Sequence, residues 1–158
     1  MVLKEHAFMY IGNNHFVIIG WNERVKNFLF CFGESLSLTK MVLIDSTLEE
    51  THLLPDQIYF IKGDPQDPET LVKANIQQAE KVLITADPDQ TEEHADINSI
   101  LSLIAFKGMN PSIYSVVEIL TSKQIVNARH AGADQIIHRS LPISHLMYDK
   151  LFSKEMLN

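Results

Sequence analysis

Short, continuous runs of apolar residues recur along the chain, and segments with the spacing of amphipathic helices separate them. Continuous runs are typical of strands in a parallel sheet that helices cover on both faces, whereas a half-exposed strand alternates apolar and polar residues. We therefore predict six strands, at residues 16–19, 41–44, 58–61, 82–84, 113–117 and 135–137.

Capping and turn residues place helices between these strands. Asn22 is a suitable N-cap for a helix over 23–32, which Gly33 ends. After the second strand, Ser46 and Glu49 have the spacing of a capping box, which predicts a short helix. Further helices are expected over 68–75, over 89–107 with Gly108 as the stop, over 121–130, and from Pro142 onward.

The alternation of strands and helices predicts an α/β fold, a Rossmann-like doubly wound parallel sheet with strand order 3-2-1-4-5-6. We expect residues 1–13 to be a leader or linker, residues 14–140 to form the Rossmann-like lobe, and residues 141–158 to form a C-terminal helix. No strand follows that helix, so its apolar face must pack elsewhere on this chain or on a partner.

The charge of the chain narrows the range of partners. It has 13 Lys and Arg against 20 Asp and Glu, a formal net charge of -7, and a negative field disfavours nucleic acid. We therefore expect no nucleic-acid partner. No apolar stretch approaches the roughly 18 residues of a membrane-spanning helix, so we expect no direct membrane insertion by this chain. The single cysteine, Cys31, lies in the apolar run FLFCF and is predicted to be a buried, inert thiol.

A ligand site is expected beyond the carboxyl ends of strands one and four, where the strand order reverses. Gly20 keeps the tight turn of a dinucleotide loop, but Asn22 and Val25 stand where the G-x-G-x-x-G fingerprint needs glycine. A dinucleotide diphosphate therefore fits less well than a mononucleotide or an empty pocket. Asp45 either accepts a hydrogen bond from a ribose hydroxyl or caps a turn, and Asp64 either contacts a base or caps the next helix. The candidate nucleotide-binding residues are Gly20, Trp21, Asn22, Glu23, Arg24, Asp45, Ser46, Asp64 and Thr85.

A second candidate site is a hard-cation site at the start of the 89–107 helix. Asp87, Asp89 and Glu92 lie there, and Glu118 joins them from the end of a neighbouring strand. Calcium prefers such carboxylate oxygens. The alternative is that these carboxylates only stabilise a helix N-terminus through its dipole. No spacing of catalytic residues stands out.

Three segments together resemble the RCK (regulator of potassium conductance) domain, also called the TrkA N-terminal domain. They are HFVIIGW at 15–21, GDPQDPETLVKANIQQAEKVLITADPD at 63–89, and ARHAGADQII at 128–137. The resemblance covers about residues 14–150 and is greatest to RCK domains that follow the two-helix pore of prokaryotic potassium channels.

The resemblance implies a ligand-sensing gating module on the cytoplasmic side of the cell membrane, not an enzyme. Such domains form homodimers through the helices after strands four and five and through a crossover helix, and they assemble into an octameric ring below the channel pore. Residues 142–157 match the start of the crossover helix, residues 1–13 would be the linker from the pore, and the family's C-terminal lobe is absent.

The resemblance leaves the ligand open. Glu118 matches one acidic residue of the calcium-gated members, but Thr85 and Val116 stand where the others would be carboxylates, so Asp87, Asp89 or Glu92 would have to substitute. Asp45 matches the ribose-contacting acid of nucleotide-binding members. The cofactor could thus be a nucleotide of the AMP, ADP, ATP or NAD kind, or a divalent cation such as calcium. The alternative functions are a nucleotide-binding oxidoreductase fragment and a pure assembly domain with an empty cleft.

Overall fold

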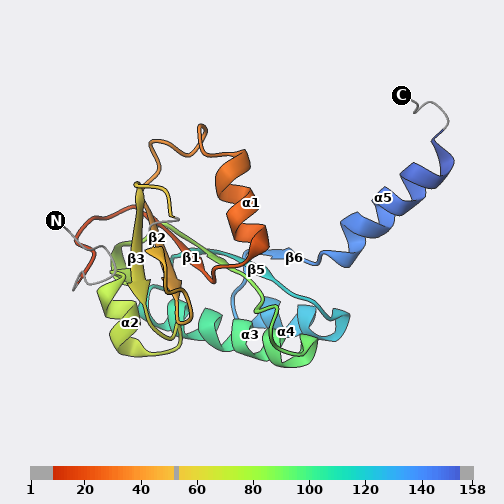
Figure 1. The fold of residues 1–158 in the computed structure, drawn as a ribbon. Coiled ribbons are helices and arrows are strands. Elements are labelled where there is room, and N and C mark those ends of the chain that lie inside the picture. Colours follow the sequence, from red (N-terminus) through yellow and green to blue (C-terminus); the bar gives the residue numbers. More distant parts are fainter. Residues whose placement is uncertain (1–8, 52–53, 154–158) are drawn as a thin grey trace.

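The computed structural model describes residues 9–51 and 54–153, and its centre is one parallel sheet of six strands (Figure 1). The strand order is β3-β2-β1-β4-β5-β6, and every pairing is parallel, which confirms the predicted doubly wound fold. The strands are β1 (Phe16–Ile19), β2 (Met41–Asp45), β3 (Ile58–Lys62), β4 (Lys81–Ile84), β5 (Tyr114–Glu118) and β6 (Gln135–Ile137).

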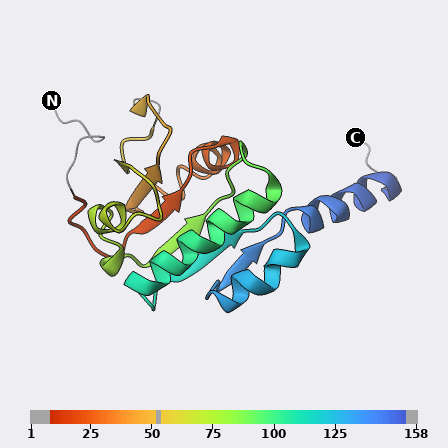
Figure 2. The ribbon, with the colours of Figure 1, turned by 90° about the horizontal axis from the view of Figure 1, so that it is seen from below.

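Helices lie on both faces of this sheet. Helix α1 covers one face, while α2, α3 and α4 lie on the other, as the two views of the ribbon show (Figures 1 and 2). The last helix, α5, projects away from the body. The helices are α1 (Glu23–Cys31), α2 (Pro68–Lys73), α3 (Glu92–Met109), α4 (Ile125–His130) and α5 (Ser140–Phe152), with short 3₁₀ turns η3 (Ile76–Gln78) and η4 (Ser122–Gln124).

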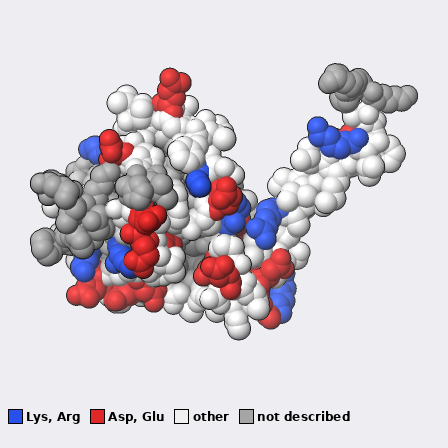
Figure 3. Space-filling view, viewed as in Figure 1, with Lys and Arg blue, Asp and Glu red and all other residues white. Residues whose placement is uncertain are grey.

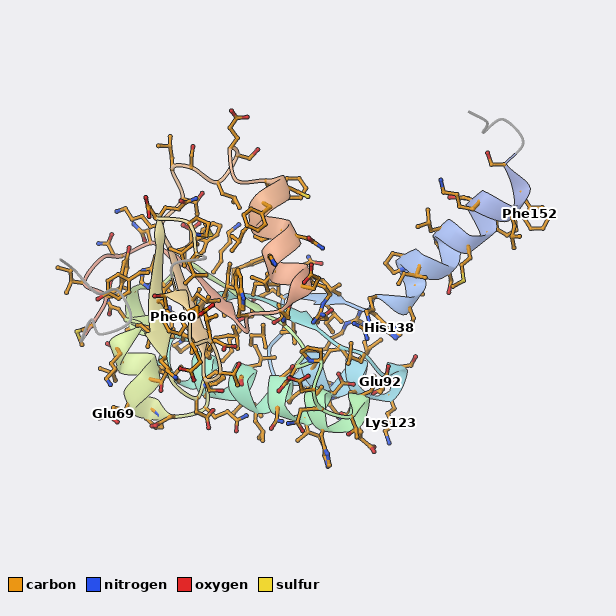
Figure 4. The ribbon with its side chains drawn as sticks, in the orientation of Figure 1. Phe60, Glu69, Glu92, Lys123, His138 and Phe152 are labelled. Carbon is orange, nitrogen blue, oxygen red and sulfur yellow. The ribbon has the colours of Figure 1, made fainter. Side chains whose placement is uncertain are left out.

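Strands β1, β2 and β3 each contribute to two apolar cores, which explains their continuous apolar runs. In β1, Val17 and Ile19 pack on the α3 side with Leu103 and Phe106, among others. Ile18, between them, points to the opposite side and packs in the core that contains Val25 and Leu29 of α1. Phe60 of β3 belongs to this second core (Figure 4). Both faces are therefore apolar, as in other parallel sheets.

The segment after β2 differs from the prediction, because Ser46 to Glu50 do not form a helix. The Asp45 carboxylate accepts hydrogen bonds from the backbone N–H groups of Thr47 and Leu48, at 2.8 and 2.7 Å. These bonds hold a tight turn one residue earlier than the predicted capping box. The capping-box prediction was wrong because a neighbouring carboxylate binds the same stretch of backbone.

The prediction that Cys31 is buried was also wrong, because the thiol is exposed. Helix α1 has only nine residues and buries Val25 and Leu29, four positions apart. Cys31 is the last residue of the helix, beyond the part that meets the sheet, so the apolar run FLFCF extends onto the surface.

Several helix boundaries differ as well. Helix α3 begins at Glu92 with Thr91 as its N-cap, and it continues through Gly108 to Met109, so Gly108 does not stop it. Helix α5 begins at Ser140 rather than at Pro142. Within the described residues, no helix combines the length and the apolar character needed to cross a membrane.

Candidate ligand-binding cleft

A cleft of about 340 Å³ lies where the carboxyl ends of β1 and β4 diverge. This is the switch point at which doubly wound sheets hold ligands, and the volume lies at the lower end of the range for small-molecule pockets. Of the residues predicted for nucleotide binding, Gly20, Trp21, Asn22, Asp45, Ser46, Asp64 and Thr85 line it. Of those predicted for cation binding, Asp87 and Asp89 line it.

Gly20 makes the turn from β1 into the cleft, and glycine is required there for two reasons. Its φ of +100° lies in the region that side chains disfavour. A Cβ atom would also lie 2.5 Å from the Thr85 Oγ1 atom. The Gly20 N–H donates to the Ile44 carbonyl at 2.9 Å, which fixes the turn against β2.

Asn22 joins two elements across the cleft. Its Oδ1 accepts the Val25 N–H at 3.0 Å, which makes it the N-cap of α1 as predicted. Its Nδ2 donates to Thr85 Oγ1, also at 3.0 Å, and Thr85 follows directly after β4. The Thr85 hydroxyl in turn donates to the Ile19 carbonyl. One side chain thus links α1 to the β1–β4 pair.

Asp45, at the end of β2, also lines the cleft. Its Oδ1 accepts the Trp21 N–H at 2.9 Å. Its Oδ2 accepts three bonds, from Thr47 N, Thr47 Oγ1 and Leu48 N, at 2.8, 2.9 and 2.7 Å. A carboxylate has about four acceptor positions, and Asp45 already accepts four hydrogen bonds, so its role in this structure is to cap this turn and fix it to the turn after β1.

Two other predicted residues lie at the rim. Asp64 Oδ1 accepts the Gln66 N–H at 2.9 Å, whereas Asp67 caps α2 through the Glu69 N–H at 3.0 Å. Asp64 therefore caps a turn and not the helix. Trp21 lines the cleft and also packs, half-buried, against the core on the α1 side.

Glu23 and Arg24 were predicted to lie in the site but do not line the cleft. Instead, Arg24 Nη2 donates to Glu118 Oε1 and to the Ala86 carbonyl, both at 2.8 Å. Glu118 is buried and also accepts the Ala86 N–H at 2.8 Å. This ion pair ties α1 to the end of β5 beside the cleft.

The four carboxylates predicted for a cation site are not brought together. The Glu118 carboxylate forms an ion pair with the Arg24 guanidinium. The Asp87 Oδ1 atom accepts the Asp89 N–H at 2.9 Å. Glu92 lies in the first turn of α3 (Figure 4). Among the residues that the structure describes, no group of three His, Cys, Asp or Glu side chains could hold a metal ion.

Asp96 is a structural residue that the sequence reading missed. It is completely buried in α3. Its Oδ1 accepts the Leu120 N–H at 2.8 Å, and its Oδ2 accepts the Thr121 N–H at 2.9 Å and the Thr121 hydroxyl at 2.7 Å. These bonds fix the turn after β5. No local pattern in the sequence marks this residue as buried, because its spacing of four from the exposed Glu92 places both on one side of the helix.

A row of exposed apolar side chains lies on the side of α3 away from the sheet. Ile97, Leu101 and Ile104 are 43%, 45% and 51% exposed, and their spacing of four and three places them on one helix face. Val126 of α4 is exposed as well, and every residue of α5 is exposed. Figure 3 shows α5 with few charged groups. The exposed large apolar residues of α5 are Leu141, Ile143, Leu146, Met147, Tyr148, Leu151 and Phe152.

A six-stranded doubly wound sheet with a polar cleft at its switch point defines a Rossmann-type domain. The family model of the calcium-activated potassium channel slowpoke-like RCK domain matches residues 12–117. The chain therefore belongs to the RCK domain family, as the resemblance in its sequence indicated.

Known proteins agree with this assignment. The chain is 44% identical over 149 residues to the "Putative potassium channel protein YugO" of Bacillus subtilis (strain 168). The matched region covers 91% of this chain and 45% of that protein. The chain thus spans less than half the length of this relative.

Two solved structures share the fold. The TrkA-N domain of the inner membrane protein ybaL from Escherichia coli has a TM-score of 0.72 at 19% identity, covering 88% of this chain and 97% of that one. The GsuK channel bound to NAD has a TM-score of 0.68 at 13% identity, covering 89% of this chain and 23% of that one.

Proposed function

We propose that this chain is a cytoplasmic, ligand-sensing regulatory domain that controls potassium ion transport through a prokaryotic potassium channel. Its membership of the RCK family and its 44% identity to YugO support this role. The domain acts by changing its own geometry when a ligand binds and by passing that change to a channel pore. Under this proposal it is not an enzyme.

The observation that carries the proposal is the uncovered apolar surface of α3, α4 and α5. Helix α5 has seven exposed large apolar side chains within thirteen residues, and it projects from the body (Figure 1). Such a helix is stable in water when its apolar side chains are buried by a partner. A second copy of this chain, paired through the same three helices, is the partner we propose, with dimers assembling further into an octameric ring beneath the pore.

The cleft is the proposed sensor. The turn that leads into α1 and the α3 residues Asn98, Ser99 and Ser102 line it, so a ligand in it contacts both this turn and α3. The GsuK channel, whose structure shares the fold, has been solved bound to NAD. This favours a small organic ligand at the switch point of the present chain. A cation is less favoured, because Arg24 already neutralises the Glu118 carboxylate.

Sedimentation equilibrium tests the assembly. We expect the wild-type chain to form dimers or larger species, since burial of α5 removes apolar area from water. Leu146→Asp, in the middle of α5, should shift the chain to monomer by placing a charge in the interface.

Val72→Asp is the matched control, because Val72 is an exposed apolar residue on α2, away from α5. It should leave the association unchanged. A strict monomer for the wild-type chain at high concentration would contradict the proposed pairing, and so would equal effects of the two substitutions.

A further inference from the structure

The N-terminus of α1 faces the switch point, where helices of this architecture commonly hold a phosphate group with their free N–H donors. In this chain the Asn22 side chain spans that position. It accepts the Val25 N–H and donates to Thr85 Oγ1, each at 3.0 Å. The bridge therefore runs between the helix end and β4, through the space that a phosphate would need.

Two of the backbone donors at this turn are also engaged. The Trp21 N–H donates to Asp45 Oδ1 at 2.9 Å, and the Val25 N–H donates to Asn22. A phosphate at this place would have to displace a side-chain oxygen from either donor, and each displaced oxygen would lose its hydrogen bond.

The charge of the cleft also disfavours a phosphate group. Four aspartates line it, and its described lining residues include no Lys, Arg or His. Arg24 lies on the first turn of α1, but it is bound to Glu118 and to the Ala86 carbonyl. A phosphate ester would thus meet four carboxylates without a compensating cation, which is unfavourable.

The rest of the cleft suits an uncharged ligand. Its floor is apolar, with Ile19, Ile44 and Ile84 at the strand ends, and Ser99 and Ser102 of α3 add hydroxyl groups. An apolar floor with a few polar groups favours a flat ring that carries hydroxyls.

Taking this cleft as the sensor of the proposed function, we infer that it accepts a nucleoside-type ligand without a phosphate, and that Asn22 is the residue that excludes phosphate esters. Asn22 does so by closing the α1 end of the cleft with its bridge to Thr85.

Isothermal titration of the 158-residue chain with adenosine, AMP and ADP tests this inference. The wild type should bind adenosine at least as tightly as AMP or ADP. Asn22→Gly, which opens the bridge and frees the helix donors, should bind ADP at least tenfold more tightly than the wild type does.

Asn27→Gly is the matched control, since Asn27 is an exposed asparagine on the same helix. It weakens the helix without touching the cleft and should not gain ADP affinity. Thr85→Val removes the bridge while it leaves the α1 cap in place, and it should show part of the gain even if Asn22→Gly folds poorly.

The inference is overturned if the wild type binds ADP more tightly than adenosine, or if neither cleft variant gains affinity for ADP. Either result leaves the proposed regulatory function intact, because that function is tested separately by the association of α5.

Discussion

At the scale of single residues, Arg24 and Glu118 form the ion pair that connects α1 to β5. The Glu118 side chain is 6% exposed and the Arg24 side chain 35% exposed. Because a carboxylate in this position has lost most of its hydration, its stability depends on the guanidinium and on the Ala86 N–H.

Arg24→Met should lower the free energy of unfolding by about 2 kcal/mol, because it leaves the Glu118 carboxylate buried without its positive partner. Urea denaturation measures the loss. Lys62→Met is the control, since the Lys62–Glu49 pair is exposed and at 3.1 Å, and its removal should cost less than about 1 kcal/mol. Equal losses for the two variants would show that the Arg24 pair adds nothing beyond a surface contact.

His15, just before β1, is another buried titratable residue. Its Nε2 lies 2.9 Å from the Ala74 carbonyl, and since a carbonyl only accepts, Nε2 carries the hydrogen. Its Nδ1 is buried without a hydrogen-bond partner in the described part of the chain. Burial lowers the pKa of His15 from its ordinary value, and the positive charge of Lys40 adds to this effect, while the bond to Ala74 opposes it.

The lowered pKa of His15 predicts a loss of stability in mild acid. The unfolded chain takes up a proton at the ordinary histidine pKa of about 6.5, whereas the folded chain does so only at lower pH. The contribution of His15 to the free energy of unfolding is therefore complete above about pH 6.5. It is lost as the pH falls below this value toward the pKa of His15 in the folded chain. Urea midpoints measured across this range should fall with a shallower slope in His15→Gln than in the wild type. His130→Gln, at an exposed histidine, should keep the wild-type slope, and an unchanged slope in His15→Gln would refute this assignment.

Among the elements, strands β1, β2 and β3 followed from the sequence because each buries apolar residues on both faces. Asn22 and Asp67 were predictable as caps because capping acts within three residues. The helix predicted from Ser46 and the burial predicted for Cys31 failed, because each depends on contacts made elsewhere. Asp45 binds both the following turn and the Trp21 N–H, 24 positions away, and the burial of Cys31 depends on where α1 leaves the sheet.

The location of the cleft was predictable, because the topology alone puts the carboxyl ends of β1 and β4 at the switch point. The roles of its residues were not. Arg24 and Glu118 are 94 positions apart in the chain, and no local pattern indicates that they form a pair. The same holds for Asp96, whose partners lie 24 and 25 positions later.

At the scale of the whole molecule, the body and α5 have different surfaces. The body carries most of the acidic side chains, while α5 is mostly uncharged (Figure 3). His138 lies at the base of α5 and Phe152 at its far end, away from the sheet (Figure 4). If a second copy covers α5, as proposed above, the assembly of the domain and its regulatory role are linked.

Under the proposed function, this domain regulates potassium transport through association of α5. The most direct measurement is potassium flux into liposomes that contain the channel carrying this domain, compared for the wild type, Leu146→Asp and Val72→Asp. We predict that Leu146→Asp changes the flux by about fivefold or more, the lower end of typical allosteric coupling, while Val72→Asp matches the wild type. A flux that is the same in all three proteins would contradict the claim.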